Sequence, residues 1–322
     1  MENTVTIPEK RNQVLVIYHR SDFDGIASRE VCRYHLEKLN YEVVCAGWDY
    51  GDPLPNEMER VDELTKVYMV DICLDSLMDK PYTKGKLVWI DHHKSAIQKW
   101  GELGHDGLRV DGVAACRLCW QWFVGMESDE RPVSDRQPYV ERKLEEPMIL
   151  TLLGEWDIFD LHDSDVIPLQ LGMKAMGEEK AAQLLRNEFR RFNGEECPGT
   201  MWELGEAIEE GLAIQKYVNQ ENRKHAKNAA YDVTFEGLKF CALNTGSPGN
   251  SQMFEGGYRD DHDALLAWRW DGKQCYVSFY HRPGREDLDL SPIAVKHGGG
   301  GHRGAAGARM SMKRFVELGL AQ

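Results

Sequence analysis

The triplet Asp91-His92-His93 follows directly on an apolar run from Leu87 to Ile90. A continuous apolar run of this kind is typical of a strand buried on both faces, so the triplet places a carboxylate and two imidazoles at a strand's end. Carboxylates and imidazoles are side chains that can bind metal ions and transfer protons. The triplet alone is also compatible with an ordinary strand end, where Asp91 caps the next helix.

Two further predicted strands, residues 13–18 and 66–70, end in the same kind of residue. The residues that follow them are His19, Asp22, Asp24 and Asp71. Ligands bind beyond the carboxyl ends of parallel strands, which meet at one edge of a sheet. Three strand ends of this kind on one edge predict a metal site there.

The order of elements predicts an α/β fold with two domains. Strands at 13–18, 41–46, 66–70 and 86–90, with helical stretches such as 26–39 between most of them, indicate a parallel sheet with right-handed crossovers. A mostly helical region, 112–193, and a long helix, 202–230, come next. Smaller strands are expected at 232–235, 238–243, 264–270 and 275–280. We expect a catalytic domain at 1–195, a connector helix at 196–230 and a smaller α/β domain at 231–322, with an active-site cleft between the domains.

A run of four glycines, Gly298 to Gly301, lies near the C-terminus and is followed by His302 and Arg303. The small residues from Gly304 to Gly307 predict the start of a helix. A glycine loop that opens a helix presents backbone N–H groups to a phosphate or carboxylate. A tight packing turn explains the glycines equally well.

Composition narrows the function classes. The 322 residues carry a net charge of −14 without a basic run, so tight binding to long duplex nucleic acid is not expected. No apolar stretch is long enough to span a membrane, and the N-terminus lacks the features of a signal peptide. The eight scattered cysteines indicate a reduced, cytoplasmic protein. The Cys116-x-x-Cys119 pair lies in a predicted helix and is interpreted as structural.

Taken together, the motifs resemble those of DHH-family phosphoesterases with the C-terminal DHH-associated domain. The resemblance spans nearly the whole chain. It rests on His19-x-x-Asp22-x-Asp24-Gly25, Asp71, Asp91-His92-His93, Asp157, Val277-Ser278-Phe-Tyr-His-Arg282, Asp289-Leu-Ser291 and Gly298-Gly-Gly-Gly-His302-x-x-Ala305-Ala-Gly307. The fourth of these lies in a diverged segment, where Asp160 and Asp163 are rivals to Asp157.

The resemblance implies a site with two Mn²⁺ ions, with Mg²⁺ or Co²⁺ as alternatives. One ion would be held by His19, Asp22 and Asp71, and the other by Asp24, Asp71, His92 and Asp157. Asp71 would bridge the two. Asp91 would orient a ligand histidine, and His93 would face the phosphate. The substrate phosphate would meet Arg282, Gly299, Gly300, Gly301 and His302.

The implied activity is hydrolysis of phosphodiester or phosphomonoester bonds in short oligonucleotides or nucleotides. Trp48, Tyr50, Tyr258 and Tyr280 are candidates for stacking a base. One alternative is hydrolysis of inorganic polyphosphate, and another is a catalytically silent nucleotide sensor. No membrane partner is expected, and the sequence leaves open whether the protein forms a homodimer.

Overall fold

The computed structural model describes residues 12–127, 145–197, 203–246 and 249–321. The chain divides into two compact units, Met1–Ile214 and Gln215–Gln322. The division falls inside the long helix α9 (Leu204–Ala229). Within the described ranges, no helix combines the length and apolar character needed to cross a bilayer.

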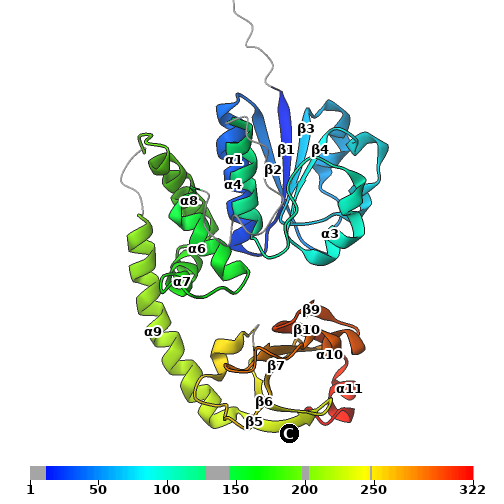
Figure 1. Cartoon of the computed structure of the whole chain (residues 1–322), viewed down its shortest axis with the longest axis vertical. Helices are drawn as coiled ribbons and strands as arrows, with labels where there is room; N and C mark the ends of the chain where they lie inside the picture. Colours follow the sequence, from blue (N-terminus) through cyan, green and yellow to red (C-terminus); the bar gives the residue numbers. More distant parts are fainter. Residues whose placement is uncertain (1–11, 128–144, 198–202, 247–248, 322) are drawn as a thin grey trace, which may run out of the picture. The chain divides into compact units, whose positions relative to one another are not determined.

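The sheet of the first unit has four parallel strands in the order β2-β1-β3-β4 (Figure 1). Its strands are β1 (Gln13–His19), β2 (Glu42–Trp48), β3 (Lys66–Val70) and β4 (Leu87–Ile90). The predicted α/β class and parallel sheet are therefore confirmed. Strand β3 has the predicted bounds, whereas β2 runs two residues beyond its predicted end at Ala46.

Both faces of this sheet are buried, because alternate residues of β1 enter two separate cores. Val14, Val16 and Tyr18 pack against a layer of long helices, and Leu15 and Ile17 pack against short elements. The long helices are α1 (Phe23–Lys38), α4 (Ala115–Glu127), α6 (Met148–Asp157), α7 (Val166–Met176) and α8 (Glu178–Phe192). The short elements that enter this second core are η1 (Asn56–Glu63), α2 (Asp75–Met78) and α3 (Lys94–Trp100). The unit also contains η2 (Pro81–Thr83) and η3 (Gly101–Leu103).

The helical region predicted at 112–193 corresponds to α4 and α6–α8, and its residues 128–144 lie outside the described part of the chain. Helix α9 was predicted at 202–230, of which Trp202 also lies outside the described residues. The N-terminal part of α9 packs closely on α7. A Cβ atom at Gly211 would lie 1.7 Å from the carbonyl oxygen of Pro168, so this approach of two helices requires glycine.

The second unit contains a six-stranded mixed sheet in the order β5-β6-β7-β8-β10-β9. The β6–β7 pair is parallel and the other pairs are antiparallel. Its elements are β5 (Tyr231–Phe235), β6 (Leu238–Asn244), η4 (Ser251–Phe254), β7 (Ala264–Trp270), β8 (Cys275–His281), α10 (Ser291–Lys296), β9 (Gly300–His302), β10 (Ala305–Met310) and α11 (Met312–Glu317). Helices α10 and α11 cover one face of this sheet.

The prediction of a helix beginning at Gly304 was wrong, because this segment forms the β9–β10 hairpin instead. Small residues suit a helix start or a close strand pair equally, and pairing of β10 with β8 decides the outcome. A Cβ atom at Gly299 would lie 1.9 Å from the carbonyl oxygen of Gly307. The glycines therefore allow two backbones to approach, as the packing alternative required.

Candidate metal centre

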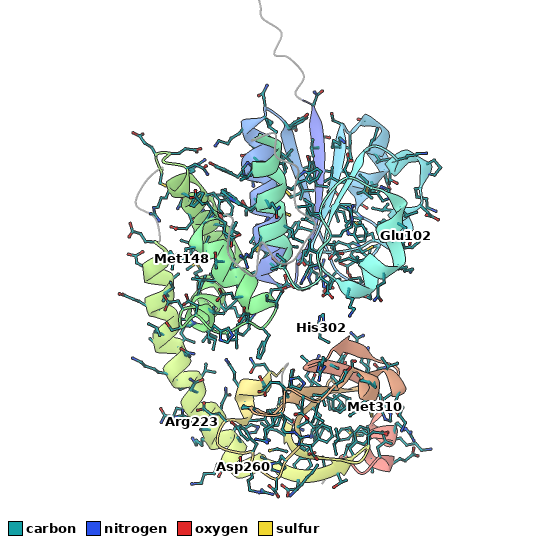
Figure 2. The ribbon with its side chains drawn as sticks, in the orientation of Figure 1. Glu102, Met148, Arg223, Asp260, His302 and Met310 are labelled. Atoms are coloured by element: carbon teal, nitrogen blue, oxygen red, sulfur yellow. The ribbon has the colours of Figure 1, made fainter. Side chains whose placement is uncertain are left out.

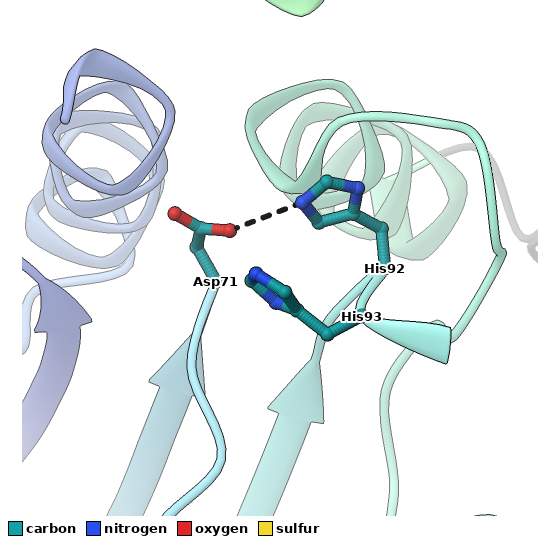
Figure 3. Close-up of side chains that lie close together, drawn as sticks. All are labelled: Asp71, His92 and His93. Carbon is teal, nitrogen blue, oxygen red and sulfur yellow. Dashed lines mark ion pairs between the residues drawn. The ribbon is translucent and has the colours of Figure 1, made fainter. Parts of the chain in front are cut away.

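Three strand ends of the first sheet bring their polar residues to one place. His19 ends β1, Asp71 follows β3, and His92 follows β4. The Oδ2 atom of Asp71 lies 3.5 Å from Nδ1 of His19, and its Oδ1 atom lies 3.4 Å from Nε2 of His92. Figure 3 shows the carboxylate of Asp71 facing the imidazoles of His92 and His93. Asp71 thus lies between two imidazoles that come from opposite sides.

Asp71 is held in an unusual position. Its backbone has a φ of 58°, in the left-handed region that aspartate tolerates better than most residues. The residue is only 1% exposed, and its N–H donates to the carbonyl oxygen of Ile90. Neither carboxylate oxygen has a hydrogen-bond donor in good geometry among the described residues. Such a buried carboxylate is costly without a cation.

Three sets of side chains have donor atoms within 4.8 Å of one another. They are His19 with Asp22 and Asp71, Asp24 with His92 and Asp157, and Asp71 with His92 and His93. The first two sets contain all six residues that the sequence resemblance nominated as metal ligands. Their assignment as ligands stays a prediction, but the fold gathers them at one site.

The start of α1 supplies two of these carboxylates. Asp22 is the N-cap of α1 and accepts from the N–H of Gly25, while its Oδ2 atom lies 2.7 Å from Nδ1 of His19. Asp24 is buried and accepts from the N–H groups of Ala115 and Cys116 at 2.8 Å each. Since these N–H groups open α4, Asp24 both caps that helix and fixes its own orientation.

Asp157, the last residue of α6, completes the group. Its Oδ2 atom lies 3.2 Å from Nε2 of His92. Its two rivals point elsewhere: Asp160 lies 3.3 Å from the exposed His162, and Asp163 accepts from the N–H of Asp165. Neither rival belongs to a set of convergent donor atoms in the described residues. The geometry therefore favours Asp157.

Asp91 is fully buried and accepts hydrogen bonds from the residues that follow it. Its Oδ1 atom accepts from the N–H groups of His92 and His93 and lies 2.7 Å from Nδ1 of His93. Its Oδ2 atom accepts from the indole of Trp89. Asp91 holds both histidines in place and does not cap α3, whose N-cap is His93.

The electrostatics of the group reflect four converging carboxylates. Burial raises the pKa of Asp71 well above its usual range, and the charge of Asp24 raises it further. The same two causes raise the pKa of Asp157 to about 7. Burial lowers the pKa of His19, but the close polar contacts and the charges of Asp22 and Asp71 more than offset this and raise it to about 10. Protons here take the place of missing positive charge.

These residues fit a pair of divalent cations. The four carboxylates would balance two such ions, and the unpaired oxygens of Asp71 offer one ligand atom to each side. A set rich in carboxylate oxygens with a minority of imidazoles suits Mn²⁺ or Mg²⁺ better than metals that prefer thiolates. Proton release from the ligands would accompany binding.

Sequence reasoning missed Asp49, whose Oδ1 atom lies 3.6 Å from Nε2 of His19. Asp49 accepts from the hydroxyl of Ser21 and directly follows β2. The signal was a fourth strand end on the same edge, and it was overlooked because the predicted strand stopped at Ala46.

The residues predicted to bind the substrate phosphate lie in the second unit. Glycines 299–301 and His302 are exposed around β9, and the side chain of His302 extends outward from the hairpin (Figure 2). Arg282 is less available, because its guanidinium donates to the carbonyl oxygens of His262 and Pro283. The phosphate contact predicted for Arg282 thus competes with two backbone bonds.

No protein-family model and no curated protein sequence matches the chain. Solved structures do match. The DHH domain of a member of a family of ribosomal proteins is 15% identical with a TM-score of 0.52, over 95% of this chain and 85% of that one. Exonuclease RecJ bound to manganese is 14% identical with a TM-score of 0.51, over 96% and 88%.

An exopolyphosphatase-related protein from Bacteroides fragilis is 12% identical with a TM-score of 0.50, over 96% of this chain and 90% of that one. Identities this low establish the fold alone. The matches nevertheless cover both units of the chain and agree with the motifs read from its sequence. The chain therefore has the fold of the DHH-family phosphoesterases.

Proposed function

We propose that this protein is a metal-dependent phosphoesterase that hydrolyses phosphodiester or phosphomonoester bonds of short oligonucleotides or nucleotides, with Mn²⁺ as its metal. The observation that carries the proposal is Asp71. Its buried carboxylate has no hydrogen-bond donor in good geometry among the described residues and faces His19 on one side and His92 on the other. A bridging ligand of two metal ions needs this arrangement.

We assign His19 and Asp22 to one ion and Asp24, His92 and Asp157 to the other, with Asp71 shared. Two divalent cations at such a site supply Lewis-acid polarisation of the phosphoryl group and acidify the attacking water. Asp22 and Asp24 are held rigid by the helix starts that they cap. Rigid ligands keep the site preorganised before substrate arrives.

His93 is proposed as the group that donates a proton to the leaving oxygen. Because Asp91 is a carboxylate, Nδ1 of His93 is assigned as the protonated nitrogen in this hydrogen bond. Burial lowers the pKa of His93, but the hydrogen bond and charge of Asp91 outweigh it and raise that pKa. The imidazolium is therefore favoured, and its Nε2–H can donate to substrate.

Short substrates are favoured over long duplex nucleic acid, since the chain carries a net charge of −14. Tyr50, whose ring lies 6.3 Å from that of His19 and is largely exposed, is a stacking candidate beside one of the proposed metal ligands. All eight cysteines are free, and Cys116 and Cys119 are buried in the core. Free thiols support the proposal of a cytoplasmic protein.

The test is a substrate panel with purified protein and Mn²⁺, each arm repeated with a chelator and with products separated by chromatography. The panel contains dinucleotides, a longer single strand, 3′-phosphoadenosine 5′-phosphate, cyclic dinucleotides and polyphosphate. We expect chelator-sensitive cleavage of a nucleotide, fastest for the short substrates. Cleavage of polyphosphate alone would replace this proposal with the polyphosphatase alternative. No cleavage of any substrate by a preparation shown to contain bound metal would favour a nucleotide sensor.

A further inference from the structure

The second unit contains a cavity of about 280 Å³ on its sheet. Side chains of β8 alternate: Val277 and Phe279 enter the core beneath α10 and α11, so Tyr276, Ser278 and Tyr280 point to the opposite face. These three residues line the cavity. The cavity therefore lies on the face that α10 and α11 leave uncovered.

The hollow arises from small residues between large ones. Across β7, β8 and β10 the register pairs Ala267 with Ser278, and Ser278 with Gly307. Tyr280 stands two residues to one side of this row. On the other side, Tyr276 is paired with both Arg269 and Arg309. The cavity thus has a low floor, an aromatic wall and one basic lining residue, Arg269. Arg309 lies across Tyr276 from Arg269, at the rim rather than in the lining.

Both arginines lie against one ring. The guanidinium carbons of Arg269 and Arg309 lie 3.9 Å and 5.2 Å from the ring centroid of Tyr276. Cation–π contacts of this kind hold arginines without neutralising them. Within the described ranges, neither arginine forms an ion pair.

Other arginines of this unit differ. Arg259 pairs with Asp232, and Arg285 pairs with Asp263. The nearest acid in sequence to Arg269 is Asp271, whose Oδ1 atom accepts from two backbone N–H groups of the following turn. These two bonds, and to a lesser extent the charge of Arg269, lower the pKa of Asp271, but among the described residues no carboxylate lies within ion-pair distance of either arginine. Two arginines that flank one ring without a direct ion pair suit phosphate.

We propose that this cavity binds a mononucleotide unit, with Arg269 of its lining and Arg309 at its rim on the phosphate and Tyr280 beside the base. The cavity has room for several water molecules, each of about 30 Å³, and so for more than a phosphate group. Planar bases stack on aromatic rings and on guanidinium groups. The inference rests on the proposed function for its choice of nucleotide, and it gives the phosphate role predicted for Arg282 to a different pair of arginines.

The test is calorimetric binding to the full chain with a chelator present, so that no metal contributes. The probes are 5′-AMP, adenosine without phosphate, and inorganic pyrophosphate without a base. We expect 5′-AMP to bind at least about tenfold more tightly than either of the others. Arg269→Gln and Arg309→Gln should each weaken 5′-AMP about tenfold, as loss of a charge-assisted contact does. Ser278→Phe should abolish binding by filling the floor.

Arg314→Gln is the matched control, because Arg314 lies on α11 at the covered face and should bind 5′-AMP as the parent does. Three outcomes would each overturn the proposal. They are no binding of 5′-AMP, 5′-AMP binding that is unchanged in all three cavity variants, and pyrophosphate binding as tight as that of 5′-AMP. Turnover of dinucleotides with Mn²⁺ is measured on the same preparations. If the protein hydrolyses dinucleotides but does not bind 5′-AMP, the proposed role of the cavity is wrong and the proposed function stands. If it binds 5′-AMP but hydrolyses nothing in the substrate panel, the proposed function is wrong and the role of the cavity stands.

Discussion

Nδ1 of His93 lies 2.7 Å from Oδ1 of Asp91, a buried carboxylate that also accepts from the backbone N–H groups of His92 and His93. One carboxylate therefore fixes the orientation and tautomer of an imidazole beside the proposed metals. A carboxylate that holds a histidine in this way commonly tunes both metal binding and proton transfer.

Replacing His93 by Asn should lower kcat by about 10²- to 10⁴-fold, the usual contribution of a general acid. The Asn amide can keep the bond to Asp91 while the proton donor is lost. Mn²⁺ affinity, measured by calorimetry, should change far less than kcat. His162→Asn serves as the control, because His162 is exposed and its replacement should leave both quantities unchanged. An equal loss of metal affinity and rate would instead make His93 a ligand.

Asp91→Asn should move the alkaline limb of the pH–rate profile to lower pH. The hydrogen bond and charge of Asp91 raise the pKa of His93, so removing that charge lets His93 lose its proton sooner as pH rises. The isosteric Asn keeps one acceptor oxygen, which limits the cost to folding. An unshifted limb, recorded with metal in excess, would exclude His93 as the titrating acid.

Asp71→Asn should abolish the rise in melting temperature that Mn²⁺ produces. A ligand at one hundred times its Kd stabilises by about 2.7 kcal/mol, which a thermal scan detects. In chelator, the variant should be at least as stable as the parent, because Asn carries no charge and so avoids the cost of ionising a buried carboxyl, which raises the pKa of Asp71. Asp75→Asn is the control, since that exposed carboxylate pairs with Lys99. A full Mn²⁺ response in Asp71→Asn would contradict the assigned bridge.

The Mn²⁺-dependent rise in melting temperature should grow from pH 6 to pH 8. Without metal, Asp157 of the folded protein keeps its proton up to its raised pKa of about 7. In the unfolded chain the same carboxyl ionises near pH 4, so the free energy of unfolding falls as pH rises from about 4 to 7. His19, with a pKa raised to about 10, stabilises the fold below pH 6.5 and loses this contribution as pH rises through 10. Metal must displace these protons, which becomes easier at higher pH. A response independent of pH would contradict the ligand set.

Asp157→Asn should weaken Mn²⁺ binding by at least about tenfold, whereas Asp160→Asn and Asp163→Asn should not. Only Asp157 lies within reach of His92 among these three. Calorimetric titration of each variant with Mn²⁺ makes the comparison. Comparable losses in Asp160→Asn would show that the segment after α6 rearranges when metal binds.

Much of the first unit follows from its sequence, because its strands are short apolar runs buried on both faces. Asp71 and the Asp91 triplet could be placed at a common edge on this basis alone. What could not be foreseen was the exact end of β2, and with it Asp49. Strand ends depend on pairing with a neighbour, here β1, which a local pattern does not contain.

The second unit was harder to predict where glycine dominates. The glycine-rich segment was taken for a helix start, but β10 pairs with β8, which lies far away in the sequence beyond α10 and β9. Such long-range pairing overrides local propensity. The Arg269–Tyr276–Arg309 arrangement has the same origin. These residues become neighbours only through sheet register, so no short sequence window contains them together.

The most direct test of the central claim is crystallography of the protein with Mn²⁺, using anomalous scattering to locate the ions. Two anomalous peaks should appear, one beside His19 and Asp22 and one beside His92 and Asp157, with an oxygen of Asp71 ligating each. A single peak, or peaks that leave Asp71 without a metal ligand, would contradict the account.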